Sequence, residues 1–536
     1  MKRQVLVALV WAAGAALGGA AGCGSSNPGS TDAGSDGGAD DAGEGRRGSG
    51  PATGGLGDAG TGAGDTGSAG DAGIADGAAA GAEPLTITRR TSYRRITNFQ
   101  RGPEAKFISD ARISADGSMI IFATFAGTYT IHSDGSNLVQ LNDKRNNGLI
   151  DISANGKKVV WYDETQTYDG WVAASDGSGK IKLPGTAGCK GLRLTAAGDQ
   201  IYEVAPDAGG IVRFAADGSG MKVIMSTADV AKLNGVDANG NHWRGVIDIS
   251  DDGSKVVFTF LWDAFAMTGE GADLKQLTQF LMPENRTLKL ARVSGNGAKL
   301  AWNVEDGANS KVTISDWGGG NPVVYSGITY SAGYWLQLSG DGSRAVQGYG
   351  LKLLDPTKVA PYDAIDSGSN SIPLGKASMD TITANGKRAC LVIEGQESTD
   401  QGRPNQIVVV DFDPPTSNGA PTIEAPAASL RALPTDGSKK TTVFAAVKDA
   451  EVTEVNTVAL RGGLRLGATP WLHWALDDTG MQGDVTAKDT TYTSNAVSIG
   501  SGDMVAPGPF TLRFVASNKA GHVLMVDTEG MEAKAP

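Results

Sequence analysis

The hydrophobic pattern between residues 85 and 415 consists of short apolar runs separated by polar turns. Met119-Ile120-Ile121-Phe122 and Lys255-Val256-Val257-Phe258 are two such runs, rich in the β-branched and aromatic side chains that favour strands. Asp-Gly and Asn-Gly dipeptides lie between many of the runs, and both residue types tolerate the positive φ that tight hairpin turns need. The pattern predicts antiparallel β-structure.

One short pattern recurs seven times: an apolar residue, Ser or Thr, a small or acidic residue, Asp or Asn, Gly, and then an apolar strand. The third copy, Leu194-Thr195-Ala196-Ala197-Gly198, is degenerate. The final glycines are Gly117, Gly156, Gly198, Gly253, Gly297, Gly342 and Gly386, at intervals of 39, 42, 55, 44, 45 and 44 residues. A period of about 40–45 residues is that of a four-stranded propeller blade. The extra residues of the 55-residue interval fall between about 226 and 241.

A second polar turn follows the first in most copies, as in Ser133-Asp134-Gly135-Ser136 and Ser175-Asp176-Gly177-Ser178. Each repeat therefore holds strands a, b, c and d, with Asp-Gly turns joining a to b and c to d. The whole pattern resembles the TolB-type, WD40-like (PD40) repeat over residues 85–415. The resemblance implies a seven-bladed β-propeller and is specific for fold, not for function.

The last copy lacks a fourth strand. It has candidate strands at Asp380–Thr383, Ala389–Ile393 and Gln406–Phe412, and then runs into Asp413-Pro414-Pro415. A strand from Leu85 to about Phe99 has no place in the first repeat. We predict that this N-terminal strand supplies the missing strand, because that arrangement leaves no open edge.

The N-terminus predicts export. A basic start, Met1-Lys2-Arg3, precedes a short apolar run, which is typical of a secretory signal over residues 1–22. Ala20-Ala21-Gly22-Cys23 resembles a lipobox, which implies lipidation of Cys23, and Gly24 after it implies the outer membrane. A plain signal peptide with an incidental cysteine is the alternative. Residues 23–84 are almost entirely Gly, Ala, Asp, Ser and Thr, and we expect a disordered tether.

Residues 421–536 show short alternating strands after a Pro- and Gly-containing linker. They predict an immunoglobulin-like β-sandwich, with strands at Thr441–Val447, Thr457–Arg461, Leu472–Leu476 and Phe510–Ser517. The predicted fold class is all-β: a seven-bladed propeller followed by this sandwich and preceded by the disordered linker.

One acidic segment of the C-terminal region resembles a turn of secreted bacterial sandwich domains. Its carboxylates are Asp477, Asp478, Asp484 and Asp489. Carboxylates on Gly-rich turns can gather the oxygen ligands that Ca²⁺ prefers, so these four residues are candidate Ca²⁺ ligands, and calcium is the candidate metal. The alternative is that these residues only build turns.

The topology sorts the loops of the propeller into two faces. The a–b and c–d turns form a uniform face, and the longer b–c and d–a loops form an irregular face, where binding residues are commonly found. Aromatic and charged side chains suited to a partner lie on the irregular face: His242, Trp243, Arg244, Tyr334, Trp335 and Tyr168. The alternative for Trp243 and Trp335 is packing between blades.

These features favour a non-catalytic cell-envelope lipoprotein, with a scaffold or display role, whose propeller binds a protein, peptide or glycan. We expect a monomer that contacts the membrane only through its lipid anchor. A formal net charge of −12 argues against nucleic acid. Cys189 and Cys390 fall three blades apart, which predicts free thiols.

Two alternatives remain: a propeller-type polysaccharide lyase or other carbohydrate-active enzyme, and a surface adhesin. The folded region has no Gly-x-Ser-x-Gly elbow, and its four histidines are scattered along the sequence. A mechanism that uses only carboxylates, such as Asp163, Glu164 or Glu394, stays open.

Overall fold

A computed structural model describes most of the chain from residue 82 onward. The described residues are 82–97, 108–146, 148–163, 169–184, 188–233, 243–261, 263–278, 286–306, 311–326, 336–347, 352–357, 362–363, 377–393, 406–414, 419–449, 451–461, 464–465, 473–479, 488–500, 503 and 505–536. The predicted signal, Cys23 and nearly all of the linker lie outside them. No helix within these ranges is long and apolar enough to cross a membrane.

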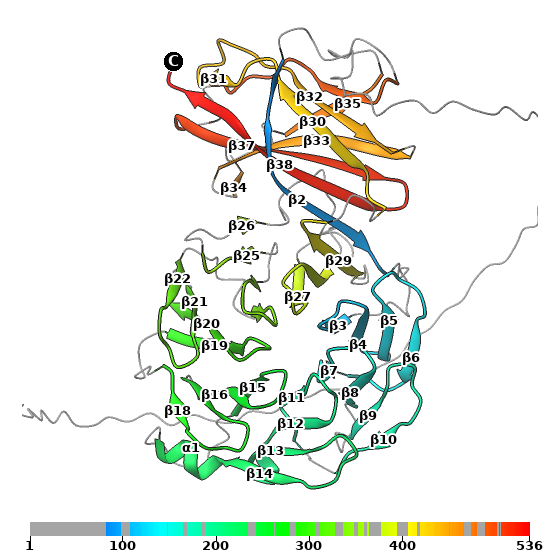
Figure 1. Cartoon of the computed structure of the whole chain (residues 1–536), viewed down its shortest axis with the longest axis vertical. Coiled ribbons are helices and arrows are strands. Elements are labelled where there is room, and N and C mark those ends of the chain that lie inside the picture. Colours follow the sequence, from blue (N-terminus) through cyan, green and yellow to red (C-terminus); the bar gives the residue numbers. More distant parts are fainter. Residues whose placement is uncertain are drawn as a thin grey trace, which may run out of the picture. The chain divides into compact units, whose positions relative to one another are not determined.

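Six of the seven repeats form separate four-stranded antiparallel sheets, the blades of a β-propeller (Figure 1). The first three sheets are β3 (Ile108–Ile113), β4 (Met119–Thr124), β5 (Gly127–His132) and β6 (Val139–Asn142); β7 (Ile150–Ile152), β8 (Lys158–Tyr162), β9 (Gly170–Ala174) and β10 (Ile181–Lys182); and β11 (Gly191–Leu194), β12 (Gln200–Ala205), β13 (Gly210–Ala215) and β14 (Lys222–Ser226). The next three are β15 (Trp243–Ile249), β16 (Lys255–Phe260), β17 (Asp263–Thr268) and β18 (Lys275–Gln276); β19 (Arg286–Val293), β20 (Lys299–Asp306), β21 (Lys311–Asp316) and β22 (Val323–Ser326); and β23 (Leu336–Leu338), β24 (Ala345–Gln347), β25 (Lys352–Leu354) and β26 (Tyr362–Asp363). Within each sheet the order follows the sequence, as the repeat predicts.

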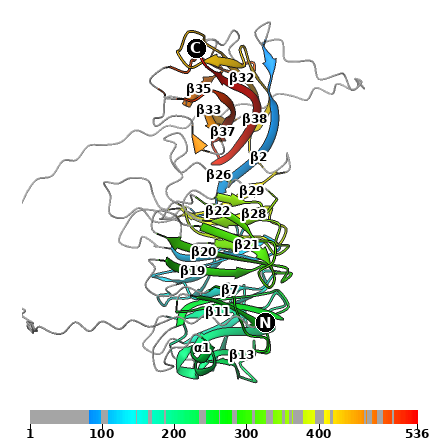
Figure 2. The ribbon, with the colours of Figure 1, turned by 90° about the vertical axis from the view of Figure 1, so that its left-hand side faces the viewer.

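The last repeat is built differently. Its strands β27 (Ala377–Ile382), β28 (Arg388–Ile393) and β29 (Gln406–Phe412) pair in order, and β29 then pairs with β2 (Thr86–Arg95). The predicted pairing of the N-terminal strand with the last repeat is confirmed. The four strands are not a separate sheet, however, because residues 91–94 of β2 pair on their other side with β38 (His522–Lys534), as both views show (Figures 1 and 2).

The seven repeated turns are joined into a closed circle by backbone hydrogen bonds of 2.7–3.0 Å. Each turn donates an N–H to a carbonyl of the next turn, and Ala384 of the last repeat donates to Ala115 of the first. The glycine that ends each turn has φ between 64° and 76°, in the left-handed region that favours glycine. The repeat motif therefore encodes both the hairpin and the contact between neighbouring sheets.

The Ser or Thr of each motif fixes its own turn. In all seven repeats its hydroxyl oxygen accepts a hydrogen bond from the backbone N–H five residues later. The same hydroxyl donates to the Asp or Asn side chain of the motif, which in the degenerate third copy is Asp199. These pairs explain why the motif requires a hydroxyl at this position.

Replacing Ser250 by alanine is expected to lower the free energy of unfolding by about 1–3 kcal/mol, because the N–H of Lys255 loses its hydrogen-bond partner and the carboxylate of Asp252 loses one donor and keeps the N–H of Ser254. Urea denaturation measures the change. Ser178→Ala is the matched control: Ser178 is exposed in a c–d turn, and we expect a loss of less than about 0.5 kcal/mol. Equal losses in the two variants would contradict the role given to the motif hydroxyl.

The extra residues of the 55-residue interval include one helix, α1 (Thr227–Leu233). Ser226 begins it: its hydroxyl accepts from the N–H of Asp229 at 3.1 Å and donates to the carboxylate of Asp229 at 2.6 Å. The sequence located this insertion correctly but gave no sign of the helix, since seven residues are too few for a clear period.

The C-terminal region contains the predicted strands, but all of them belong to a single hydrogen-bonded sheet. Its strands are β1 (Glu83–Pro84), β30 (Thr422–Ala428), β31 (Ala432–Pro434), β32 (Val443–Lys448), β33 (Val452–Arg461), β34 (Leu464–Arg465), β35 (His473–Asp477), β36 (Thr491–Ser494), β37 (Gly508–Asn518) and β38. The order β1-β30-β32-β36-β35-β33-β37-β38 continues through β2 into the last repeat, so an immunoglobulin-like sandwich of two sheets stays a prediction. Buried apolar residues of these strands, including Phe514 and Leu512, form the core of the region.

Candidate binding site in the central channel

The innermost strand of each repeat carries one polar residue at the same place, two positions before the Ser or Thr of the motif. The seven residues, called here the girdle, are Arg112, Asp151, Arg193, Asp248, Arg292, Gln337 and Thr381. The centre of the propeller contains two cavities, and each girdle residue lines at least one of them. Charged side chains thus alternate in sign over five consecutive repeats. The sequence shows these polar residues at a fixed offset from the motif. They lie on strands, however, whereas the binding residues predicted from the sequence lie in loops.

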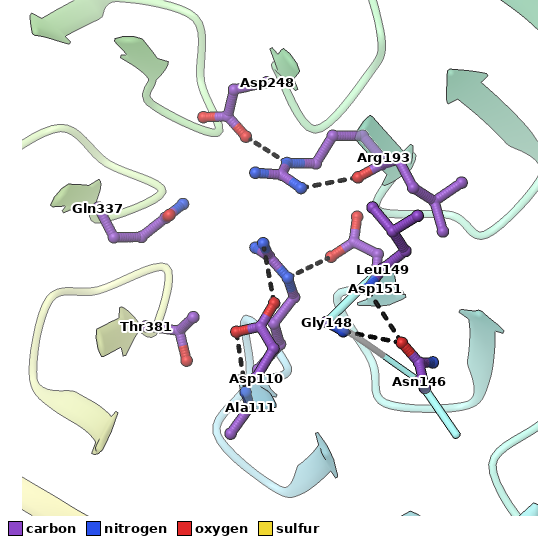
Figure 3. A network of polar contacts seen from close by, with 12 residues as sticks. Asp110, Ala111, Asn146, Gly148, Leu149, Asp151, Arg193, Asp248, Gln337 and Thr381 are labelled. Atoms are coloured by element: carbon purple, nitrogen blue, oxygen red, sulfur yellow. Dashed lines mark hydrogen bonds and ion pairs between the residues drawn. The ribbon is translucent and has the colours of Figure 1, made fainter. Parts of the chain in front are cut away.

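Hydrogen bonds of the girdle connect neighbouring repeats (Figure 3). Asp151 accepts from the N–H of Leu194 at 2.7 Å, and Thr381 accepts from the N–H of Ile113 at 3.0 Å, so the last repeat is tied to the first. The guanidinium of Arg193 donates to Asp248 at 2.7 Å. One role of the girdle is therefore structural.

Burial sets the electrostatics of the girdle. It raises the pKa of the carboxyls of Asp110 and Asp151, with nearby arginines opposing the shift. Burial, reinforced by the positive charge of Arg193, lowers the pKa of Arg292 to about 9. The Arg292 guanidinium is still protonated at pH 7, and it stays charged at a cost, since its hydrogen bonds go to Leu336, Gln337 and Ala291 and include no carboxylate.

Two cavities flank the girdle and differ in their charge. On the side of the repeated turns, a cavity of about 120 Å³ is lined by girdle residues and by the backbone of the turn circle, with Asp251 at its rim. On the opposite side, towards the irregular loops, a cavity of about 260 Å³ lies at the beginnings of the innermost strands. We call this second cavity the basic chamber.

Four cationic side chains and one carboxylate line the basic chamber: Arg112, Lys190, Arg193, Arg292 and Asp110. The remaining lining is mostly apolar and includes Leu149, Leu192 and Leu290, with Ser109 as its one other polar side chain. An excess of positive charge in a partly apolar, enclosed space favours an anionic group over water as its occupant.

Arg112 is the residue of the chamber that the protein itself satisfies least. Its side chain is 15% exposed, and its nearest carboxylate oxygens are on Asp110 at 3.6 Å and Asp151 at 3.9 Å, too far for hydrogen bonds. The buried Nε of Arg112 has no hydrogen-bond partner among the described residues. Arg193 and Arg292 both have such bonds. A buried guanidinium without acceptors can bind a carboxylate or phosphate oxygen.

Most aromatic and charged residues predicted for the irregular face lie outside the described residues. This applies to His242, Tyr334, Trp335 and Tyr168, and for Arg244 only the backbone, in β15, is described. Trp243 is 3% exposed; its ring packs on Phe258 and Phe260 and its Nε1 donates to Thr227 at 3.0 Å. Its burial favours the packing alternative over a direct contact with a ligand.

The described residues of the acidic C-terminal segment hold one another's turns. Asp478 accepts from the backbone N–H groups of Asp489 and Thr490, and Asp489 accepts from that of Thr491. Asp477 accepts from Thr479, and Asp484 lies outside the described residues. Across the part of the chain that the structure describes, no group of three or more His, Cys, Asp or Glu is placed to hold a metal ion. Calcium binding stays a prediction.

Asp163, one of the three carboxylates considered for catalysis, accepts hydrogen bonds from Asn142, Trp161 and Trp171. These bonds, together with its burial, describe a structural carboxylate; Glu164 and Glu394 lie outside the described residues. Cys189 and Cys390 are buried thiols outside any disulfide, as predicted.

No protein-family model and no curated protein matches the sequence. Solved structures that resemble the chain include an oligogalacturonate lyase from Vibrio parahaemolyticus, with 10% identity over 62% of this chain and 98% of that one and a TM-score of 0.42. An oligogalacturonate lyase in complex with manganese matches with 11% identity over 63% and 98% and a TM-score of 0.43. The Cps50 (Swd1) β-propeller domain of Myceliophteria thermophila matches with 12% identity over 58% and 98% and a TM-score of 0.41. Likeness at this level carries no argument about what the chain does, and the fold assignment rests on the strand pairing.

Proposed function

We propose that this protein is a binding propeller that takes an anionic group of its partner, such as a carboxylate, into the basic chamber. The observation that carries the proposal is Arg112, whose buried Nε has no hydrogen-bond partner among the described residues and whose ion pairs with Asp110 and Asp151 are long, in a cavity that four cationic side chains line against one carboxylate. The chamber lies on the side of the irregular loops, so a partner held by those loops reaches it directly.

A purely structural role explains only part of the channel. Structure accounts for Arg193, which is paired with Asp248 at 2.7 Å. It does not account for Arg292, whose charge is held at a cost by burial, or for Arg112, whose Nε makes no hydrogen bond. Two cations kept in an unfavourable state beside one cavity are typical of a ligand site.

The finer organisation is part of the same proposal. The sheet β27-β28-β29-β2 acts as the seventh blade of a TolB-type propeller, and the C-terminal region is an immunoglobulin-like module. The chain is anchored at the cell envelope through a lipid on Cys23 and acts there without catalysis, as a monomer that binds a protein, peptide or glycan. The support is the repeat, the signal-like N-terminus and the circle of turn hydrogen bonds.

Arg112→Gln is expected to weaken binding of an anionic probe by about 10- to 100-fold, because one charge-assisted pair of hydrogen bonds is lost. The melting temperature is expected to fall, because the variant removes the positive charge nearest to the buried carboxyls of Asp110 and Asp151, so binding is compared at a temperature where both proteins are folded. The probes are a hexaglutamate peptide and a short oligouronide, measured by isothermal titration calorimetry.

Arg145→Gln is the matched control, because Arg145 is exposed in the loop after β6 and does not line the chamber. It removes the same charge and should leave the affinity unchanged. Equal loss of affinity in both variants would reduce the effect to general charge attraction and overturn the proposed site. Shortening of the oligouronide during the titration would contradict the non-catalytic assignment in favour of the lyase alternative.

A further inference from the structure

A third cavity lies where the last repeat meets the C-terminal strands. It has a volume of about 270 Å³ and is called here the strand-junction pocket. Its lining residues come from β2, β28, β29, β38 and the segment before β30: Ser92, Tyr93, Arg94, Arg388, Asp411, Ala420 and His522. None of them lines the central channel, so the pocket is separate from the basic chamber.

Strand register places the polar side chains of the pocket on one face of the shared sheet. Arg94 of β2 lies directly opposite His522 of β38, and Ser92 lies opposite Asp411 of β29. Asp411 is in turn opposite Arg388 of β28. The polar side chains thus lie on two neighbouring rows of one sheet face, His522 and Arg94 on one and Ser92, Asp411 and Arg388 on the other, and directly opposed residues have Cβ atoms about 4.5–5.5 Å apart.

Only some of the hydrogen-bonding groups of these polar side chains have a partner within the protein. Arg388 donates to Asp411, to the carbonyl of Gly117 and to the hydroxyl of Ser133. Arg94 donates through Nη2 to the carbonyl of Ser133. The Nε of Arg94 and the Nδ1 of His522 are both buried and have no hydrogen-bond partner among the described residues. These two unpartnered nitrogens belong to the pair of residues that face each other across β2 and β38.

The charges of the pocket are also unbalanced. Its lining holds two guanidinium groups and one imidazole against the single carboxylate of Asp411, which Arg388 already binds. Burial, and after it the positive charge of Arg388, lowers the pKa of Arg94, while Asp411 and Asp134 oppose the shift. The pocket therefore offers Arg94 no carboxylate that is not already bound by another residue.

We propose that the strand-junction pocket binds an oxyanion of the phosphate class, held between Arg94, His522 and Arg388. Donors reach the pocket from three different strands, and this arrangement fits a tetrahedral group better than a planar carboxylate, which one arginine fork binds in its own plane. The bound group offsets the charge of Arg94 and forms a hydrogen bond with the imidazole of His522. Because it contacts both neighbours of β2, its binding stabilises the junction of the last repeat with the C-terminal strands.

The first test measures thermal unfolding of the full chain with inorganic phosphate at low millimolar concentration, against sodium chloride at the same ionic strength. We expect the melting temperature to rise with the logarithm of the phosphate concentration above the dissociation constant, by about 1–2 °C when phosphate exceeds that constant tenfold. Arg94→Gln and His522→Gln should each abolish most of this rise. A rise that is linear in phosphate concentration, or no rise, would overturn the proposal, because unspecific stabilisation grows steadily with concentration whereas a binding site contributes logarithmically.

Two control variants distinguish binding in this pocket from general charge attraction and from binding in the channel. Arg95→Gln removes the same charge from the next residue of β2, which is exposed and points to the opposite face, and it should keep the full rise. In Arg112→Gln, which removes an arginine of the basic chamber, the part of the rise that depends on Arg94 and His522 should remain. Loss of the rise in Arg112→Gln alone would move the phosphate effect to the channel and overturn the inference without affecting the proposed function.

A second arm distinguishes the free ion from a phosphate carried by a larger molecule. The probe is glycerol 3-phosphate under the same conditions. Stabilisation at a concentration at least ten times lower than inorganic phosphate requires would assign the pocket to a phosphomonoester group, with further contacts from the carrier. Equal or weaker stabilisation would assign it to the free ion. Stabilisation by either probe must disappear in Arg94→Gln, and stabilisation that persists in this variant would contradict the proposed site.

Discussion

Tyr93→Ala is expected to destabilise the protein by about 3–5 kcal/mol, the loss usually seen when a large aromatic ring is removed from a core. Tyr93 is 7% exposed, and it packs in a cluster that contains residues of β25, β29, β37 and β38. Because its strand pairs with both β29 and β38, the loss should lower the stability of the last repeat and of the C-terminal strands together. Differential scanning calorimetry should show one transition at a lower temperature.

Tyr93→Phe keeps the ring and is the matched control for this variant. We expect its free energy of unfolding to stay within about 1 kcal/mol of the wild type. If Tyr93→Ala instead separates the transition into two, with one half at the original temperature, the two regions are coupled less tightly than the shared strand indicates.

Asp248→Ala is expected to cost about 3–5 kcal/mol, since it leaves the buried guanidinium of Arg193 without its principal partner. The same carboxylate accepts a hydrogen bond from the backbone N–H of Val293 at 3.1 Å, so the variant also leaves this buried N–H without its acceptor. The free energy of unfolding is measured by urea denaturation at pH 7.

Asp251→Ala removes a carboxylate three residues further along and is the matched control. Burial, with the negative charges of Asp248 and Asp252, raises the pKa of Asp251, which means that the ionised form is disfavoured in the folded protein. Removing it is therefore expected to leave stability unchanged or to raise it slightly at pH 7. A large loss in Asp251→Ala, equal to that of Asp248→Ala, would contradict the specific role assigned to the Arg193–Asp248 pair.

The local elements of this fold are written in the sequence because each repeat carries its own turn chemistry. A hydroxyl, an Asp or Asn and a Gly at fixed spacing form the same hydrogen bonds in every copy, so the hairpins follow from neighbouring residues alone. The spacing of Gly117 and its six equivalents then gave the repeated four-stranded sheets. The missing fourth strand of the last repeat correctly indicated the pairing of β2 with β29.

The candidate site was harder to predict because reasoning about loops directs attention to aromatic residues. Trp243 is adjacent to His242 and Arg244 in sequence, which is typical of a binding loop, yet the ring of Trp243 is buried against Phe260. Whether an aromatic side chain at the start of a strand points to a partner or to the core depends on packing partners that are distant in the sequence.

The sequence by itself determined the class of fold, the position of the repeats and the residue offset at which girdle side chains occur. Only the tertiary structure decided that the Arg193 guanidinium hydrogen-bonds Asp248 while the Nε of Arg112 has no hydrogen-bond partner among the described residues, because pairing across a ring depends on distances between repeats. It also decided that β2 is shared, since Thr91 to Arg94 meet β38 on the edge that the last repeat leaves free. Local hydrogen bonds are encoded within a few residues, whereas the charge balance of a cavity is a property of strands that meet only in the folded chain.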